Sequence, residues 1–262
     1  MRSTHAACLG LLHVGLLLLA AALASCTSAD VDDRSDLVEQ HWDSADGNPT
    51  HATHSLMAEY AIKTLRAELP EVKQYKKEIV RGANLELHDR VHETHEALRL
   101  ELGGNNWAAE RPELLWEKAR ASYALGDRAQ AYFYVGIMLH YVQDMGVPAH
   151  AFHVYHQSGP RNWDHLEVLG FFDFHADLRS PGASDPRLDN PVDYIEWSAS
   201  TARDHFVTAF PGAQYHRRYF PQAYGDMSEE HWAFIRRREA DCARGTAFAL
   251  RSAARALARS SE

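Results

Sequence analysis

The sequence is poor in cysteine, which limits the part that disulfides can play in its stability. Three cysteines occur among 262 residues, and two of them, Cys8 and Cys26, lie in or beside an apolar N-terminal segment. If that segment is cleaved before Cys26 and Cys26 is then modified, Cys242 has no partner for a structural disulfide. If Cys26 stays unmodified, a Cys26–Cys242 bridge is the alternative. On the first interpretation, stability has to come from the packing of the chain.

The sequence also lacks an excess of positive charge. Its formal net charge is −9 at pH 7, and loss of Arg2 with the N-terminal segment takes it to −10. Because Lys and Arg make most of the contacts to nucleic-acid phosphates, stable nucleic-acid binding is not expected. The chain contains no nucleophile elbow, no P-loop and no paired CxxC motif, so these common motifs do not account for its function.

Two further absences define the fold class. No Pro-, Gly- or Ser-rich stretch is long enough to separate two domains, and no stretch alternates apolar and polar residues for long. Apolar residues recur at helical spacing instead, and a hydrophobic content of 45% is enough for one sizeable core. The sequence therefore predicts an all-α protein with a single multi-helix domain over residues 42–262.

Capping and breaking residues divide this domain into predicted helices. The predicted ranges are 54–65 before Pro70, 71–81, 85–102 before Gly103, 111–125 with Pro112 in its first turn, 127–145 capped by Asp127, 190–210, and a last helix that opens at Ser228. The segment 177–190 is the clearest predicted loop.

The N-terminus has the features of an export signal. Arg2 precedes an apolar run of about 16 residues, which is too short for a comfortable membrane span, and Leu23–Cys26 reads LASC, in the form of a lipobox. We interpret residues 1–25 as a lipoprotein signal peptide, Cys26 as the lipidated residue and residues 26–41 as a polar tether. The protein is then expected to be exported and lipid-anchored to the bacterial membrane. Thr27 stands where an Asp would follow the cysteine in the sorting rule of many Gram-negative bacteria, and by resemblance to that rule the absence of Asp favours the outer membrane. An ordinary secretory signal, giving a secreted protein, is the alternative.

Histidine is unusually abundant, and its distribution suggests metal binding. The chain has 17 histidines, which cluster between residues 41 and 175. In HYVQDMGVPAHAF, residues 140–152, His140 and Asp144 are four apart and share one helix face. Pro148 is expected to end that helix, so that His150 approaches from a loop. A core histidine bonded to a buried aspartate is the alternative for the isolated pair.

The segment HYVQDMGVPAH resembles the metal-binding helix of the zinc-dependent phospholipase C family, which includes bacterial phosphatidylcholine-hydrolysing enzymes and clostridial α-toxins and is related to the S1/P1 single-strand nucleases. The resemblance implies that His140 and Asp144 hold paired zinc ions and that His150 holds a third. WDSADGNPTHATHSLMAEYAIKTL is similar to the start of the mature phospholipases, which implies that Trp42 and His54 are zinc ligands, with His51 as a neighbouring candidate. The twelve residues from Trp42 to His54 favour the phospholipase branch over the nucleases.

The sequence departs from the family pattern at three places. Trp42 has a free amino group only if the chain is cleaved after His41. His165 and Glu167, the candidates for the third zinc, are two residues apart, where the family has one helical turn. The acidic residue and histidine that follow Gly82 fit best as Glu86 and His95, or else belong to a solvated helix face. The competing candidates at these places are His153, His156 and Asp164 for the third zinc, and Asp89 and His92 for the segment after Gly82.

The resemblance implies a hydrolase with up to three Zn²⁺ ions. The resemblance further implies that Asp144 bridges two ions and that Glu86 orients or deprotonates the attacking water. The implied substrate is a phospholipid or another phosphodiester. The protein is expected to be a monomer that meets the membrane through its N-terminal lipid anchor. An S1/P1-type nuclease or 3'-nucleotidase and a non-catalytic zinc-binding lipoprotein are the alternative functions.

Overall fold

A computed structural model describes residues 53–84, 107–152, 154, 166, 183–221 and 223–260. The regular elements in these ranges are all helices, so the all-α prediction is confirmed. The described residues belong to one compact unit, Val38–Glu262. The predicted signal peptide, lipidated Cys26, tether and helix 85–102 lie outside them. Within the described ranges, no helix combines the length and the hydropathy needed to cross a membrane.

The N-terminal part of the unit consists of α2 (Thr53–Leu65), α3 (Pro70–Gln74) and α4 (Lys76–Ala83). In α2, Met57, Ala61 and Leu65 are fully buried at a spacing of four, as the predicted helix requires. The predicted single helix 71–81 is wrong, because the chain breaks at Tyr75, whose φ of −102° and ψ of 28° are not helical. The Tyr75 ring stacks on Tyr132 at this break, with the ring centroids 5.1 Å apart.

The next two helices are α5 (Trp107–Ala124) and α6 (Arg128–Asp144). Pro112 was expected in the first turn of its helix, but α5 begins at Trp107 and Pro112 lies inside it. The turn between the helices agrees with the prediction. Gly126 has a φ of +84°, which glycine adopts without strain, and the Asp127 carboxylate accepts a hydrogen bond of 3.0 Å from the Gln130 N–H and so caps α6.

Helices α4 and α6 cross at unusually close range because each has a glycine at the crossing. A Cβ atom on Gly82 would lie 2.3 Å from the Phe133 carbonyl oxygen, and one on Gly136 would lie 2.3 Å from that of Ile79. A side chain at either position would therefore force the backbones apart. This close approach brings Ala83, the last residue of α4, against α6.

The chain after α6 turns at Gly146 into the short helix α7 (Pro148–Ala151) and later forms α10 (Asp193–Ala209), the 3₁₀ turn η4 (Tyr224–Asp226) and the long helix α11 (Glu229–Arg259). The prediction that Pro148 leads into a loop is wrong. Proline is well suited to the first position of a helix, where no intrahelical N–H bond is lost, so Pro148 begins α7 and His150 is helical. The Ser228 hydroxyl caps α11 by accepting from the His231 N–H at 3.2 Å.

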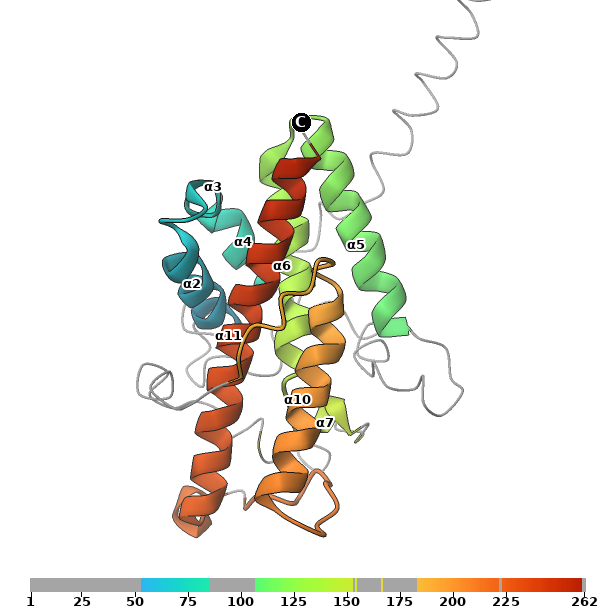
Figure 1. Cartoon of the computed structure of the whole chain (residues 1–262). Coiled ribbons are helices and arrows are strands. Elements are labelled where there is room, and N and C mark those ends of the chain that lie inside the picture. The colour runs from blue at the N-terminus through green and yellow to red at the C-terminus, as the bar shows by residue number, and fades with distance from the viewer. Residues whose placement is uncertain are drawn as a thin grey trace, which may run out of the picture. The chain divides into compact units, whose positions relative to one another are not determined.

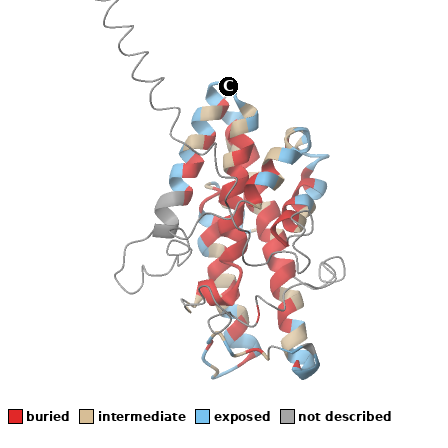
Figure 2. Ribbon diagram, turned by 180° about the vertical axis from the view of Figure 1, so that it is seen from behind, coloured by how far each residue is buried: buried red, intermediate tan, exposed pale blue. Residues whose placement is uncertain are grey.

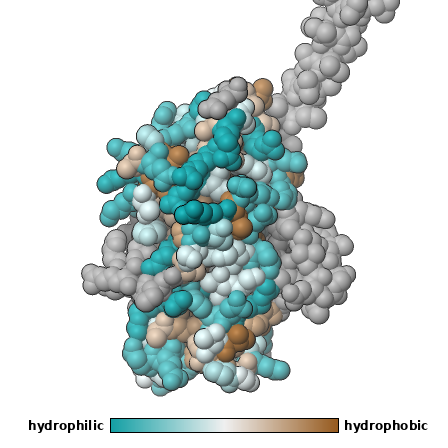
Figure 3. Space-filling view, in the orientation of Figure 1, coloured by the Kyte–Doolittle hydropathy of each residue, from teal (hydrophilic) through white to brown (hydrophobic). Residues whose placement is uncertain are grey.

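Helix α6 packs against α2, α4, α5, α10 and α11, and α11 also packs against α2 and α10 (Figure 1). The residues buried between these helices lie along the faces that turn toward one another (Figure 2). The face in Figure 3 is mostly hydrophilic, with small, separate apolar spots. An aromatic cluster packs at the end of α7. Phe152, the residue that follows α7, packs edge-on against Phe206 and stacks on Tyr215, at centroid distances of 5.3 and 5.4 Å.

Candidate metal centre

Three predicted ligands from two helices converge in the structure. His54 comes from the first turn of α2, and His140 and Asp144 come from the last turns of α6. Each residue offers one ligand atom, and these atoms lie within 4.8 Å of one another. All three residues are buried, with exposed fractions of 3%, 2% and 6%. His140 and Asp144 lie close together because they are four residues apart on one helix, whereas the position of His54 beside them depends on how α2 packs against α6.

The orientation of His54 is fixed by Gln143. The Gln143 side-chain N–H group donates to the His54 carbonyl oxygen at 3.4 Å, so its Oε1 atom faces His54 Nδ1 at 2.5 Å. Because an amide oxygen only accepts, the proton of the neutral ring belongs on Nδ1. The other nitrogen, Nε2, then presents a lone pair toward Asp144 Oδ1, 3.4 Å away.

The orientation of His140 is fixed by the backbone of α4. Its Nδ1 donates to the Ala83 carbonyl oxygen at 3.0 Å, a contact that the close crossing at Gly82 and Gly136 makes possible. The neutral ring therefore directs Nε2 toward Asp144 Oδ2 at 3.3 Å. Acceptors on the second ring nitrogen are typical of metal-binding histidines. Both histidines of this group have one.

The electrostatics of the group favour a neutral imidazole at His54. Burial, followed by the charge of the adjacent His140, lowers the pKa of His54 to about 4, so this ring is neutral near pH 7. The two rings are stacked with their centroids 4.3 Å apart, an arrangement that two positive charges would oppose. When both rings are neutral, two lone pairs converge on one carboxylate in a buried site.

This donor set fits a zinc ion. Zinc takes neutral imidazole nitrogen and carboxylate oxygen, and two ligand atoms about 2.1 Å from a tetrahedral ion lie about 3.4 Å apart. The two nitrogen–oxygen distances of 3.4 and 3.3 Å agree with that separation. A cation would also offset the burial of the Asp144 charge. Metal binding is the chemistry to which the buried group is suited.

His150 is buried in α7, close enough that its charge would lower the pKa of His54, but it is not a member of the three-residue group. Its assignment to a third ion stays a prediction.

The other predicted site residues lie outside the described ranges. These are Trp42, Glu86, His95, His165 and Glu167, together with the competing candidates His51, Asp89, His92, His153, His156 and Asp164. Two contributors were missed in the sequence, the Gln143 side chain and the Ala83 carbonyl group. Gln143 lies inside the HYVQD motif, but only the packing of α2 on α6 reveals its role.

Among known proteins, a solved structure of similar fold was found. No protein-family model matches the chain, and no curated protein sequence matches it. Among solved structures, the α-toxin of Clostridium perfringens from avian strain SWCP has a similar fold, with a TM-score of 0.54 and 16% sequence identity. The similarity covers 83% of this chain and 66% of the toxin chain. At this identity the comparison shows the fold alone, and that fold is the one that the sequence resemblance implied.

Proposed function

We propose that this protein is a zinc-dependent phosphodiester hydrolase of the phospholipase C type. The observation that carries the proposal is the arrangement at Asp144, whose two oxygens each face the Nε2 atom of a different, suitably oriented histidine. One carboxylate placed in this way is suited to bridge two metal ions. The fold shared with the α-toxin supports the same assignment.

The residues of the chain would perform defined tasks in such a reaction. Bound zinc ions would supply Lewis acidity and a water of lowered pKa. His54 and His140 would bind the zinc ions through neutral imidazoles. Gln143 and the Ala83 carbonyl group would fix the orientation of these rings, and Asp144 would be a ligand shared by two ions. We propose Glu86 as the residue that orients or deprotonates the attacking water. The proposed remaining ligands, for up to three ions in all, are Trp42, His95, His150, His165 and Glu167.

Phospholipid is the proposed substrate class. The spacing from Trp42 to His54 favours the phospholipase branch, and the fifteen residues from His150 to His165 agree with it. We further propose that the protein is exported, that Cys26 anchors it to the membrane that contains its substrate, and that it acts as a monomer. The chain spans 66% of the α-toxin's length, so the activity of the whole toxin is not transferred with the fold.

The test is release of phosphocholine from phosphatidylcholine vesicles by the full-length chain with zinc, compared with Asp144→Asn. Asp204→Asn is the matched control, because it is the same substitution at an exposed position on α10. Zinc-dependent release that is lost in Asp144→Asn and kept in Asp204→Asn would support the proposal.

Other outcomes separate the alternatives. Faster hydrolysis of single-stranded DNA than of phosphatidylcholine would favour a nuclease. Tight zinc binding without hydrolysis of either substrate would favour a non-catalytic zinc protein. Activity that emerges only in a chain starting at Trp42 would show that cleavage after His41 is required.

A further inference from the structure

A buried arginine on α11 holds the turn that connects the two predicted metal-binding segments. Arg238 is only 1% exposed, and its Nε atom donates to the Gly146 carbonyl oxygen at 3.0 Å. Gly146 lies between Asp144, at the end of α6, and His150, in α7. The arginine is 92 residues away in sequence, so this contact ties a distant helix to the exit of the metal-binding helix.

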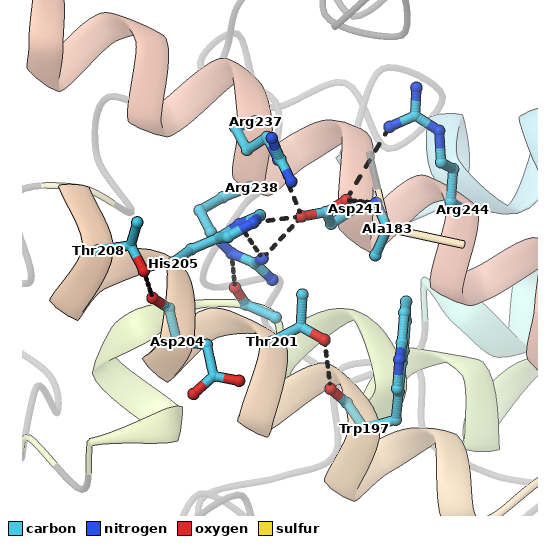
Figure 4. A network of polar contacts seen from close by, with 11 residues as sticks. Ala183, Trp197, Thr201, Asp204, His205, Thr208, Arg237, Arg238, Asp241 and Arg244 are labelled. Atoms are coloured by element: carbon cyan, nitrogen blue, oxygen red, sulfur yellow. Dashed lines mark hydrogen bonds and ion pairs between the residues drawn. The ribbon is translucent and has the colours of Figure 1, made fainter. Parts of the chain in front are cut away.

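A network of polar contacts orients Arg238 itself (Figure 4). Its Nη1 atom donates to Asp241 Oδ2 at 3.1 Å, and Asp241 also accepts from the Ala183 N–H at 2.7 Å and contacts His205 Nδ1 at 3.0 Å. Burial acts to raise the pKa of Asp241, but the hydrogen bond from His205 and the charge of Arg238 bring it below its ordinary value. Asp241 is therefore a fixed anion that keeps the guanidinium pointed at Gly146.

Tight packing holds the same turn from two sides. A Cβ atom on Gly146 would lie 2.0 Å from Cys242 Sγ on α11 and 3.2 Å from Ser198 Oγ on α10. The Ser198 hydroxyl donates to the Val142 carbonyl oxygen at 2.7 Å, which fixes α10 to the last turns of α6. The turn at Gly146 can therefore take only a narrow range of positions relative to α10 and α11.

We infer that Arg238 is a positioning residue of the metal site, which sets the placement of α7 and His150 relative to His140 and Asp144 by holding the Gly146 carbonyl group. A guanidinium is suited to this task because its donors diverge, so that one side chain binds a carbonyl and a carboxylate at once. The inference rests on the proposed zinc binding but not on the proposed hydrolysis.

The test compares two arginine-to-methionine variants of the full chain. Arg238→Met keeps a long apolar side chain in the core and removes every donor. Arg236→Met makes the same change at the surface of the same helix, where Arg236 pairs with exposed Glu229 at 2.6 Å. Zinc affinity is measured by competition with a chromophoric chelator, and Co²⁺ absorption reports the geometry of the site.

We expect zinc affinity to fall about 10- to 100-fold in Arg238→Met, as for other losses of groups that orient ligands, with an altered Co²⁺ spectrum. Arg236→Met should match the wild type. Equal affinities and spectra in the two variants, both folded by circular dichroism, would overturn the inference.

A second pair of variants decides the question if Arg238→Met does not fold. Gly146→Ala brings a methyl group against Cys242 Sγ and should displace the turn and weaken zinc binding. Gly146→Ala with Cys242→Ala removes that sulfur and should restore most of the affinity. Unchanged affinity in Gly146→Ala would contradict the inference. A wild-type chain that binds zinc but releases no phosphocholine contradicts only the proposed function, and one that binds no zinc contradicts both.

Discussion

Two buried aspartates, Asp144 and Asp241, have a histidine at hydrogen-bonding or ion-pair distance, but their charges are balanced differently. Asp144 faces the imidazoles of His54 and His140, at 3.4 and 3.3 Å. Asp241 faces His205 at 3.0 Å and, in addition, three arginines. These arginines are Arg237, Arg238 and Arg244, at 3.7, 3.1 and 4.0 Å.

The difference separates a carboxylate with a structural role from one that is suited to bind a metal ion. A guanidinium stays charged at all relevant pH values and is part of the chain, so Asp241 keeps its counter-charge permanently. Imidazoles at Asp144 can supply lone pairs instead when they are neutral, and such a group is suited to a cation that can be exchanged. A buried carboxylate surrounded by neutral, well-oriented histidines therefore indicates a metal site more strongly than carboxylate burial alone.

The largest expected effect is on the stability of the metal-free chain. Asp241→Asn should lower the free energy of unfolding by about 3–5 kcal/mol, because it leaves the buried guanidinium of Arg238 without its carboxylate. Asp144→Asn should cause no comparable loss when chelator is present, since the imidazoles of His54 and His140 can be neutral once the carboxylate is removed, whereas a guanidinium stays charged. Urea denaturation with chelator measures both, with Asp204→Asn as control. Equal losses in the two buried variants would show that the comparison is wrong.

The two regions should also respond to pH in different ranges. The pKa of His54 is about 4 in the folded chain, against 6.5 ordinarily, so between these values the unfolded chain binds a proton that the folded chain does not. Stability of the metal-free chain should therefore rise with pH across this range, by about 3 kcal/mol. The lowered pKa of Asp241 gives a contribution that is present above its ordinary pKa, about 4, and lost only as pH falls through the lowered value.

Urea denaturation from pH 4 to pH 7 measures the slope. His54→Gln should flatten it, whereas His216→Gln, at an exposed position, should leave it unchanged. A slope that persists in His54→Gln would assign the proton uptake to another group.

Zinc itself should stabilise the chain through Asp144. At a free zinc concentration about 100 times the Kd, the free energy of unfolding should rise by about 2.7 kcal/mol. Chelator should reverse this gain in the wild type and in Asp204→Asn but should have no effect in Asp144→Asn. Zinc stabilisation that survives in Asp144→Asn would place the ion elsewhere.

The smallest effect concerns the residue that orients His54. Gln143→Ala removes the acceptor of the Nδ1 proton, and we expect zinc affinity to fall about 10- to 100-fold while the ligands remain. Gln130→Ala, in the first turn of the same helix, is the control. An unchanged affinity in Gln143→Ala would mean that packing alone orients the ring.

Features that depend on local spacing could be predicted from the sequence. The helix that contains His140 and Asp144, its cap at Asp127 and the cap of α11 at Ser228 each follow from residues within a few positions. His54 was identified only through the family resemblance, because nothing near it in sequence indicates α6 as its neighbour. The contacts of Gln143, Ala83 and Arg238 join residues 89, 57 and 92 positions apart, so they arise only from tertiary packing.

Three helix predictions were wrong because they relied on local rules alone. Continuous helical periodicity favoured one helix over 71–81, but the helix is interrupted at Tyr75. The ring of Tyr75 stacks there on Tyr132, which is distant in sequence. The rule that proline begins or ends a helix failed for Pro112, which lies within α5. Before Pro148 it correctly predicted the end of α6, but it missed that Pro148 also begins α7. Proline lacks a backbone N–H group and has a fixed φ. The packing of the surrounding chain decides whether it lies at the start of a helix or inside one.

The crossing at Gly136 has a consequence for design. Gly136, His140 and Asp144 follow one another at intervals of four along a single face of α6, so this face combines a point of close helix contact with two proposed ligand positions. Transplanting the two ligands alone onto another helix would reproduce their spacing but not the carbonyl that orients the imidazole. A designed copy of this centre would need the glycine pair as well, since the distance between two backbones is as much a component of the site as any side chain in it.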